Sequence, residues 1–127
     1  MEEQVVIGVG MPAWIYLNMF GAIVNDAFGS YPYLVGSATR TKKWRDVDVR
    51  LILTDEEYEK VIGKLRSPDI INPRLRAFNL AFSKLGESLT GLPIDFQIQQ
   101  QTQANAHYPH QERHALIQTS IPETNDE

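Results

Sequence analysis

The sequence predicts a single α/β (α+β) domain in which a mixed β-sheet packs against helices. Three observations lead to this prediction. Residues 5–25 are largely apolar and carry no charge. Residues 45–53 show a two-residue alternation, with polar and apolar side chains taking turns from Asp46 to Leu51. Two later segments carry helix-start signals before apolar stripes. With 127 residues, of which 43% are apolar and 22% charged, the chain has the length and composition of one soluble domain.

The first helix is predicted from Pro12 to about Phe28. Proline fits the first turn of a helix, where its missing N–H would have no partner, and Gly29 is a typical residue just past a helix end. The charge-free run is long enough to raise the possibility of a membrane span. Its glycines and asparagines, and the acidic residues before it, favour instead a buried helix covered on more than one side. We therefore expect no membrane association.

Strands are predicted at residues 31–36, 45–53 and 92–99. In the middle one, Asp46, Asp48 and Arg50 alternate with valines and leucines. Because successive side chains of a strand point to opposite faces, these three polar residues should share the face turned away from the core.

Two helices are predicted between the second and third strands. Thr54 and Glu57 have the spacing of a capping box, and an apolar stripe follows them. Asn72 and Pro73 form a second start signal, a capping residue followed by proline in the first turn. Apolar residues then recur at helical spacing until Gly91, which should end the helix.

The apolar pattern fades after the third strand. We therefore divide the chain into a core, residues 1–101, and a polar, partly disordered C-terminal tail, residues 102–127. His107, His110 and His114 lie three and four residues apart, which on a helix could place two imidazoles together as metal ligands. Pro109 and the polar surroundings favour a solvated tail over a metal site.

The aspartates of the strands carry the chemistry that the sequence suggests. Asp46 and Asp48 form a pair of like charges on one face, which a hard divalent cation such as Mg²⁺ would neutralise. Asp95 lies between two apolar residues in the third strand and is the candidate for a third ligand, as in two-metal sites. The alternative is that each aspartate lies on an ordinary solvent-facing strand.

Charge is distributed unevenly along the chain. The net charge is −4, whereas four of the six residues from Arg40 to Arg45 are basic. This distribution argues against binding to an extended nucleic acid and suits a small phosphorylated ligand, although a solvated basic loop would look the same. Trp44 within the loop could stack on a base or anchor the loop to the core. The chain has no cysteine, which fits a cytoplasmic location.

Taken in order along the chain, these elements resemble a known family. The letters VGS at 35–37, DVDV at 46–49 and IDF at 94–96, with Arg40 three residues after the serine, are similar to the signature of minimal nucleotidyltransferases of the DNA polymerase β-type superfamily. The resemblance covers about residues 11–99. It implies a nucleotidyltransferase-like fold.

The resemblance also implies an activity: transfer of a nucleoside monophosphate from a nucleoside triphosphate to a hydroxyl acceptor, with release of pyrophosphate. The residues that would bind the phosphates are Gly36, Ser37, Arg40, Lys42 and Lys43. The residues that would bind Mg²⁺ or Mn²⁺ and act in catalysis are Asp46, Asp48 and Asp95. The acceptor is not identified, and its recognition would come from the tail, a partner chain or a second copy.

Two features differ from the family pattern. The loop between Ser37 and Asp46 is shorter than in the family, and Thr41 stands where small members have glycine. These differences favour a second hypothesis, in which the domain has the same fold but no catalysis. It would then act as an interaction module, either an antitoxin-like partner or a nucleotide sensor.

Overall fold

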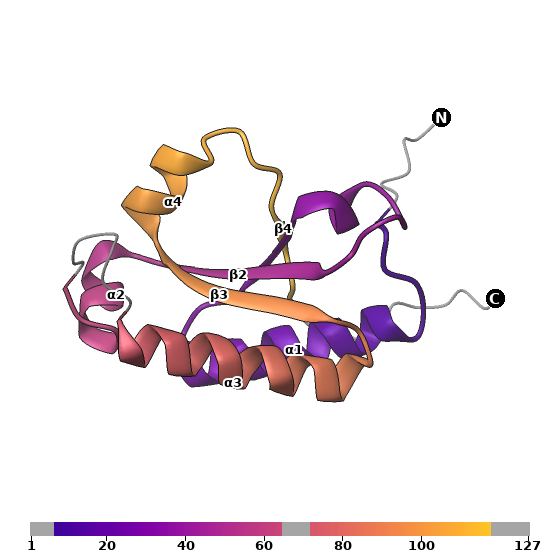
Figure 1. The fold of residues 1–127 in the computed structure, drawn as a ribbon, viewed down its shortest axis with the longest axis horizontal. Coiled ribbons are helices and arrows are strands. Elements are labelled where there is room, and N and C mark those ends of the chain that lie inside the picture. The colour runs from indigo at the N-terminus through magenta and orange to yellow at the C-terminus, as the bar shows by residue number, and fades with distance from the viewer. Residues whose placement is uncertain (1–6, 65–71, 118–127) are drawn as a thin grey trace.

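The computed structural model describes residues 7–64 and 72–117 and shows one small α+β domain. A four-stranded open sheet has the strand order β3-β2-β1-β4, with β2 and β3 parallel and the other neighbours antiparallel. In chain order the elements are α1 (Ala13–Phe28), β1 (Tyr33–Val35), the 3₁₀ turn η1 (Gly36–Thr39), β2 (Val47–Leu53), α2 (Asp55–Val61), α3 (Pro73–Thr90), β3 (Ile94–Gln100), α4 (Gln101–His107) and β4 (His114–Ala115). Figure 1 shows α1 and α3 side by side on one face of the sheet, with α4 on the other.

The predicted helix ends are confirmed. Gly29 and Gly91 follow α1 and α3 with φ of +80° and +75°, the left-handed conformation that glycine adopts without a Cβ penalty. At the start of α2, the Thr54 hydroxyl accepts the Glu57 N–H at 3.2 Å. Asn72 accepts two backbone N–H groups at the start of α3. Each bond satisfies a donor that the first helical turn leaves without a partner.

The alternation predicted for the second strand is also confirmed. The four core-facing side chains of β2 are at most 1% exposed, and the three side chains between them lie on the opposite, partly exposed face. The core-facing residues are Val47, Val49, Leu51 and Leu53, and the residues between them are Asp48, Arg50 and Ile52. The core lies between this apolar face and helices α1 and α3. Phe96 of β3 is at its centre, edge-on to Phe20 of α1 at 5.9 Å between ring centroids and 5.4 Å from Phe82 of α3.

Side chains of α3 satisfy the outer edge of β3. The Ile98 N–H donates to Asn79 Oδ1 at 2.9 Å, and the Phe96 N–H donates to Ser83 Oγ at 2.9 Å. An edge strand normally presents unpaired backbone groups that can recruit another chain. Here a helix covers that edge with two specific polar side chains.

The chain continues as ordered structure beyond residue 101, where we predicted the tail of residues 102–127 to begin. The chain forms α4 directly after β3 and then adds β4 to the free edge of β1. Leu116 is fully buried, and its backbone lies so close to Gly21 of α1 that a Cβ there would be 2.2 Å from the Leu116 carbonyl oxygen. A two-residue strand and one buried leucine are too short to produce a periodic pattern. Residues 118–127 lie outside the described part of the chain.

Helix α1 differs from its prediction in one respect. Leu17, Phe20 and Val24 are fully buried, as expected for a core helix. However, Tyr16 is 42% exposed and Met19 37% exposed, so the helix is not covered on all its apolar sides. In the described residues, no helix is both long and apolar enough to cross a membrane.

Candidate functional site at the Asp48–Asp95 strand pair

The structure places Asp48 and Asp95 side by side. They are register partners on the parallel strands β2 and β3, so their side chains project from the same face of the sheet. This face is opposite the core, and the two side chains remain 29% and 41% exposed. Asp95, the candidate third ligand, therefore lies beside Asp48, the second aspartate of the Asp-x-Asp segment.

Gly36 brings the backbone of the next element against this pair. Its neighbour Val35 is the β1 partner of Asp48, and Gly36 has φ of +78°. A Cβ on Gly36 would lie 2.4 Å from Asp48 Oδ2, a separation that real side chains do not reach. The positive φ favours glycine here, and any side chain at this position would force the Asp48 carboxylate to move.

The turn that begins at Gly36 is short and internally bonded. Thr39 Oγ1 donates to the Gly36 carbonyl at 2.7 Å, and the Arg40 N–H donates to the Ser37 carbonyl at 3.0 Å. The Thr39 residue is only 3% exposed, so the turn is anchored by a buried side chain. The predicted strand therefore ends at Val35, and the Gly-Ser step forms a separate turn beside Asp48.

An N-terminal segment holds the loop that follows. Gly8 donates its N–H to Ala38 at 2.7 Å and accepts the Trp44 Nε1–H at 2.8 Å. The Trp44 ring also packs against the core. Of the two roles open for this tryptophan, anchoring the loop is the one that its contacts support.

Arg50 is the residue of this site that sequence reasoning missed. Its Nη2 lies 3.5 Å from Asp95 Oδ2 and 3.9 Å from Asp48 Oδ1. Its Nη1 donates to the backbone carbonyls of Asp95 at 2.6 Å and of Val49 at 3.2 Å. The only sequence signal was its position two residues after Asp48, on the same face of the strand.

Burial and three neighbouring charges together set the pKa of Asp48. Burial is the largest cause and raises this pKa above its ordinary value of 3.8, because the ionised carboxylate loses water. The Arg50 guanidinium lowers it, and the negative charges of Asp95 and Asp46 raise it. The pKa of Asp48 is raised overall.

Asp46 lies just before β2, and its side chain is exposed. Asp48 and Asp95 offer the oxygen donors that Mg²⁺ prefers, so this pair fits a divalent cation by its chemistry. Within residues 7–64 and 72–117, however, no group of three or more His, Cys, Asp or Glu side chains is gathered to hold a metal ion. The expected three-aspartate set is therefore brought together only in part.

The remaining predicted residues lie outside the pair. Arg40, Lys42 and Lys43 are exposed in the loop after η1. Among the described residues, His107, His110 and His114 belong to no group of three or more His, Cys, Asp or Glu side chains that could hold a metal ion. His107 Nε2 lies 3.1 Å from Gln103 Oε1, and His114 Nε2 lies 3.0 Å from Glu112 Oε2.

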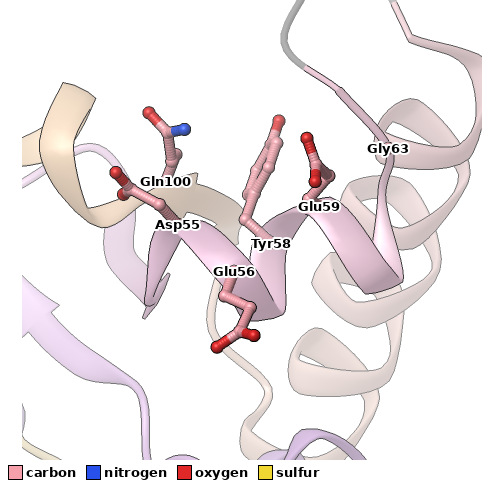
Figure 2. Close-up of a pocket in the computed structure, with 6 residues that line it drawn as sticks. All are labelled: Asp55, Glu56, Tyr58, Glu59, Gly63 and Gln100. Atoms are coloured by element: carbon pink, nitrogen blue, oxygen red, sulfur yellow. The ribbon is translucent and has the colours of Figure 1, made fainter.

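A separate pocket lies at the other end of β2, with a volume of about 270 Å³. Figure 2 shows Asp55, Tyr58, Glu59 and Gln100 pointing to one side, while Glu56 points away. Hydrogen bonds from the Thr102 hydroxyl and N–H lower the pKa of Asp55. This carboxylate thus joins α2 to α4, and no residue predicted from the sequence as functional lines the pocket.

Comparisons of the chain with protein-family models, with curated protein sequences and with solved structures gave no match.

Proposed function

We propose that this chain is a nucleotidyltransferase-like domain that binds a nucleoside triphosphate and a divalent cation. It transfers the nucleoside monophosphate to a hydroxyl acceptor and releases pyrophosphate. One observation carries the proposal: Asp48 and Asp95 are in register on parallel neighbouring strands, and Gly36 packs directly against Asp48. A mixed sheet with helices on one face supports the nucleotidyltransferase-like fold.

In this proposal the turn after β1 binds the phosphates. Gly36 and Ser37 would donate from their backbone N–H groups and from the Ser37 hydroxyl. Glycine allows a phosphate oxygen to approach the backbone closely. Arg40 would neutralise phosphate charge by charge-assisted hydrogen bonds, with Lys42 and Lys43 contributing from the exposed loop.

The aspartates beside this turn would hold the divalent cation. Asp48 and Asp95 would hold Mg²⁺ or Mn²⁺, with Asp46 as the third carboxylate. When bound, such a cation stabilises the negative charge that develops during transfer at phosphorus. Asp95 would in addition orient the acceptor hydroxyl by accepting its hydrogen bond.

Arg50 favours a second candidate function. It supplies a positive charge to the same two carboxylates from within the protein. A domain that neutralises its own acidic pair needs no metal for its structure. It could therefore be a catalytically silent module that binds nucleotide as a sensor or pairs with another protein.

A thermal-shift series with each nucleoside triphosphate, with and without Mg²⁺ or Mn²⁺, tests nucleotide binding. A ligand that binds only the native state stabilises it by about 2.7 kcal/mol at a hundred times its Kd. We expect metal-dependent stabilisation of the wild type, its loss in Asp48→Asn and its retention in Asp26→Asn, an exposed control on α1. No shift at millimolar nucleotide would reject nucleotide binding by this chain.

Pyrophosphate release separates the two candidate functions. If nucleotide binds, the enzyme should release pyrophosphate when hydroxyl acceptors are supplied, and Asp48→Asn should release none. Metal-dependent nucleotide binding without pyrophosphate release, over a broad acceptor set that includes serine peptides and nucleic-acid ends, would favour the sensor.

A further inference from the structure

We propose that the Arg50 guanidinium is the resident counter-cation of the Asp48–Asp95 pair, so that a divalent cation reaches the pair only by competing with it. The inference deepens the proposed function and rests on it in one respect, because it takes these two carboxylates as the metal ligands. Arg50 acts through them and is therefore a positioning residue.

The position of Arg50 is fixed by the backbone of both strands. The donation from Nη1 to the Asp95 carbonyl, at 2.6 Å, crosses from β2 to β3, and the Val49 carbonyl accepts a second bond from the same nitrogen. The side chain is only 12% exposed. A guanidinium anchored in this way does not depend on the carboxylates for its position.

The carboxylates are held more loosely than the guanidinium. Asp95 Oδ2 lies 3.5 Å and Asp48 Oδ1 3.9 Å from Nη2, both longer than a strong charge-assisted hydrogen bond. The other oxygen of Asp95 accepts from Gln97 Nε2 at 3.5 Å. Arg50 therefore stabilises the two carboxylates mainly by the attraction of its positive charge and not by short hydrogen bonds. Their oxygens remain able to form a shorter bond to another cation.

A divalent cation and Arg50 would compete for these oxygens. Mg²⁺ binds carboxylate oxygens at about 2.1 Å, much closer than the guanidinium does here. At the same time the fixed positive charge of Arg50 repels any cation that approaches, and this repulsion is weakly screened at a partly buried position. Arg50 should therefore weaken the affinity of the Asp48–Asp95 pair for metal. It should also keep the domain folded with the two carboxylates side by side when no metal is bound.

Substitutions at Arg50 separate its charge from its hydrogen bonds. Arg50→Gln keeps an amide donor for the Asp95 carbonyl but removes the charge. Arg50→Met removes both, and Arg50→Lys keeps the charge without the planar fork. A purely structural arginine would leave metal binding unchanged in all three, whereas a counter-cation would change it in the two neutral variants alone.

The test uses Mn²⁺ alone, with no nucleotide. We would measure the melting temperature in EDTA and in MnCl₂, and Mn²⁺ binding by the loss of its free electron paramagnetic resonance signal. Arg50→Gln and Arg50→Met should melt lower than the wild type in EDTA, regain stability in MnCl₂ and bind Mn²⁺ about tenfold more tightly, which corresponds to about 1.4 kcal/mol. Arg50→Lys should bind Mn²⁺ as the wild type does, and adding Asp48→Asn to Arg50→Gln should abolish the gain.

Two outcomes would overturn the inference directly. One is an unchanged Mn²⁺ affinity in both Arg50→Gln and Arg50→Met. The other is a loss of stability in these variants that MnCl₂ does not restore. If the neutral variants do not fold in EDTA, they must fold in MnCl₂, and failure in both conditions contradicts the inference. If the wild type binds nucleotide but the two neutral Arg50 variants bind Mn²⁺ no more tightly than the wild type, this inference alone is rejected. If the neutral variants bind Mn²⁺ more tightly but the wild type binds no nucleotide, only the proposed function is rejected.

Discussion

At the scale of single residues, Gly36 couples the phosphate-loop candidate to the acidic pair. The residue turns the chain out of β1 with a left-handed backbone, and a side chain on it would have to displace the Asp48 carboxylate. Because both constraints meet at one residue, a change there should affect the turn and the carboxylate together. Gly91 offers a matched comparison, with φ of +75° and open space around it.

Gly36→Ala should therefore be more destabilising than Gly91→Ala. The backbone strain alone costs about 1 kcal/mol, and forcing the methyl against Asp48 brings the total to roughly 2–4 kcal/mol. Chemical denaturation of the two variants measures the difference. In the double variant Gly36→Ala/Asp48→Ala the extra cost should disappear, because the carboxylate is gone. Equal losses for the two single variants would contradict the close contact at Gly36.

The raised pKa of Asp48 predicts a pH-dependent effect of Asp48→Asn. The folded-state pKa of Asp48 lies above the ordinary 3.8, so the native state holds the proton more tightly than the unfolded state does. The contribution of this group to stability therefore falls as the pH rises from 3.8 through the raised folded-state pKa. In EDTA at pH 7, Asp48→Asn should therefore have a higher melting temperature than the wild type. The difference should vanish near pH 3. A variant that is less stable than the wild type at pH 7 would show that the Arg50 contact outweighs burial.

At the scale of elements, α3 both covers the core and completes the hydrogen bonding of β3. Its apolar side packs on the sheet, as the helical spacing predicts. Asn79 and Ser83 lie on the adjoining side and bind the strand edge. The same helix thus fixes the position of β3, and with it the place of Asp95 beside Asp48.

Asn79→Ala should weaken this edge. The substitution leaves the Ile98 N–H without its partner, which costs about 1–3 kcal/mol if water does not replace it. Hydrogen exchange of the Ile98 amide measures the local effect at the strand edge. Urea unfolding measures the change in the free energy of unfolding of the whole domain. Leu80→Ala is the control, because Leu80 is the next residue on α3 and is 62% exposed. Unchanged exchange at Ile98 would contradict the role of Asn79.

At the scale of the whole molecule, the chain after β3 returns to the sheet and closes the domain. It crosses from α4 on one face to β4 at the far edge, and then places Leu116 against α1. The close approach to Gly21 shows that helix and C-terminal segment fit each other. The domain therefore requires residues well beyond the last segment with a clear apolar pattern.

Leu116→Ala should destabilise the whole domain. Removing a fully buried leucine side chain costs about 2–5 kcal/mol, because it loses burial and leaves a cavity. Ile117→Ala provides the neighbouring control, since Ile117 is 46% exposed and should change stability little. Equilibrium urea denaturation of both variants gives the comparison. Similar, small effects of the two substitutions would mean that residues 114–117 contribute little to the fold.

The sequence by itself determined most of the elements, because their signals are local. A capping side chain, a proline in the first turn, a glycine after the last turn and a strict alternation each act within a few residues of chain. These signals predicted α1, α3, β2 and β3 near their observed bounds, and the start of α2. They also predicted which face of β2 carries Asp48 and Arg50.

Only the tertiary structure decided which residues meet. The register of β2 against β3 places Asp95 beside Asp48 and Arg50 between them, and Asp46 is left outside the strand. The burial of Leu116 likewise depends on α1, which lies far away in the sequence. Such contacts depend on how strands align and helices pack over long separations, and no periodicity within one segment encodes that alignment.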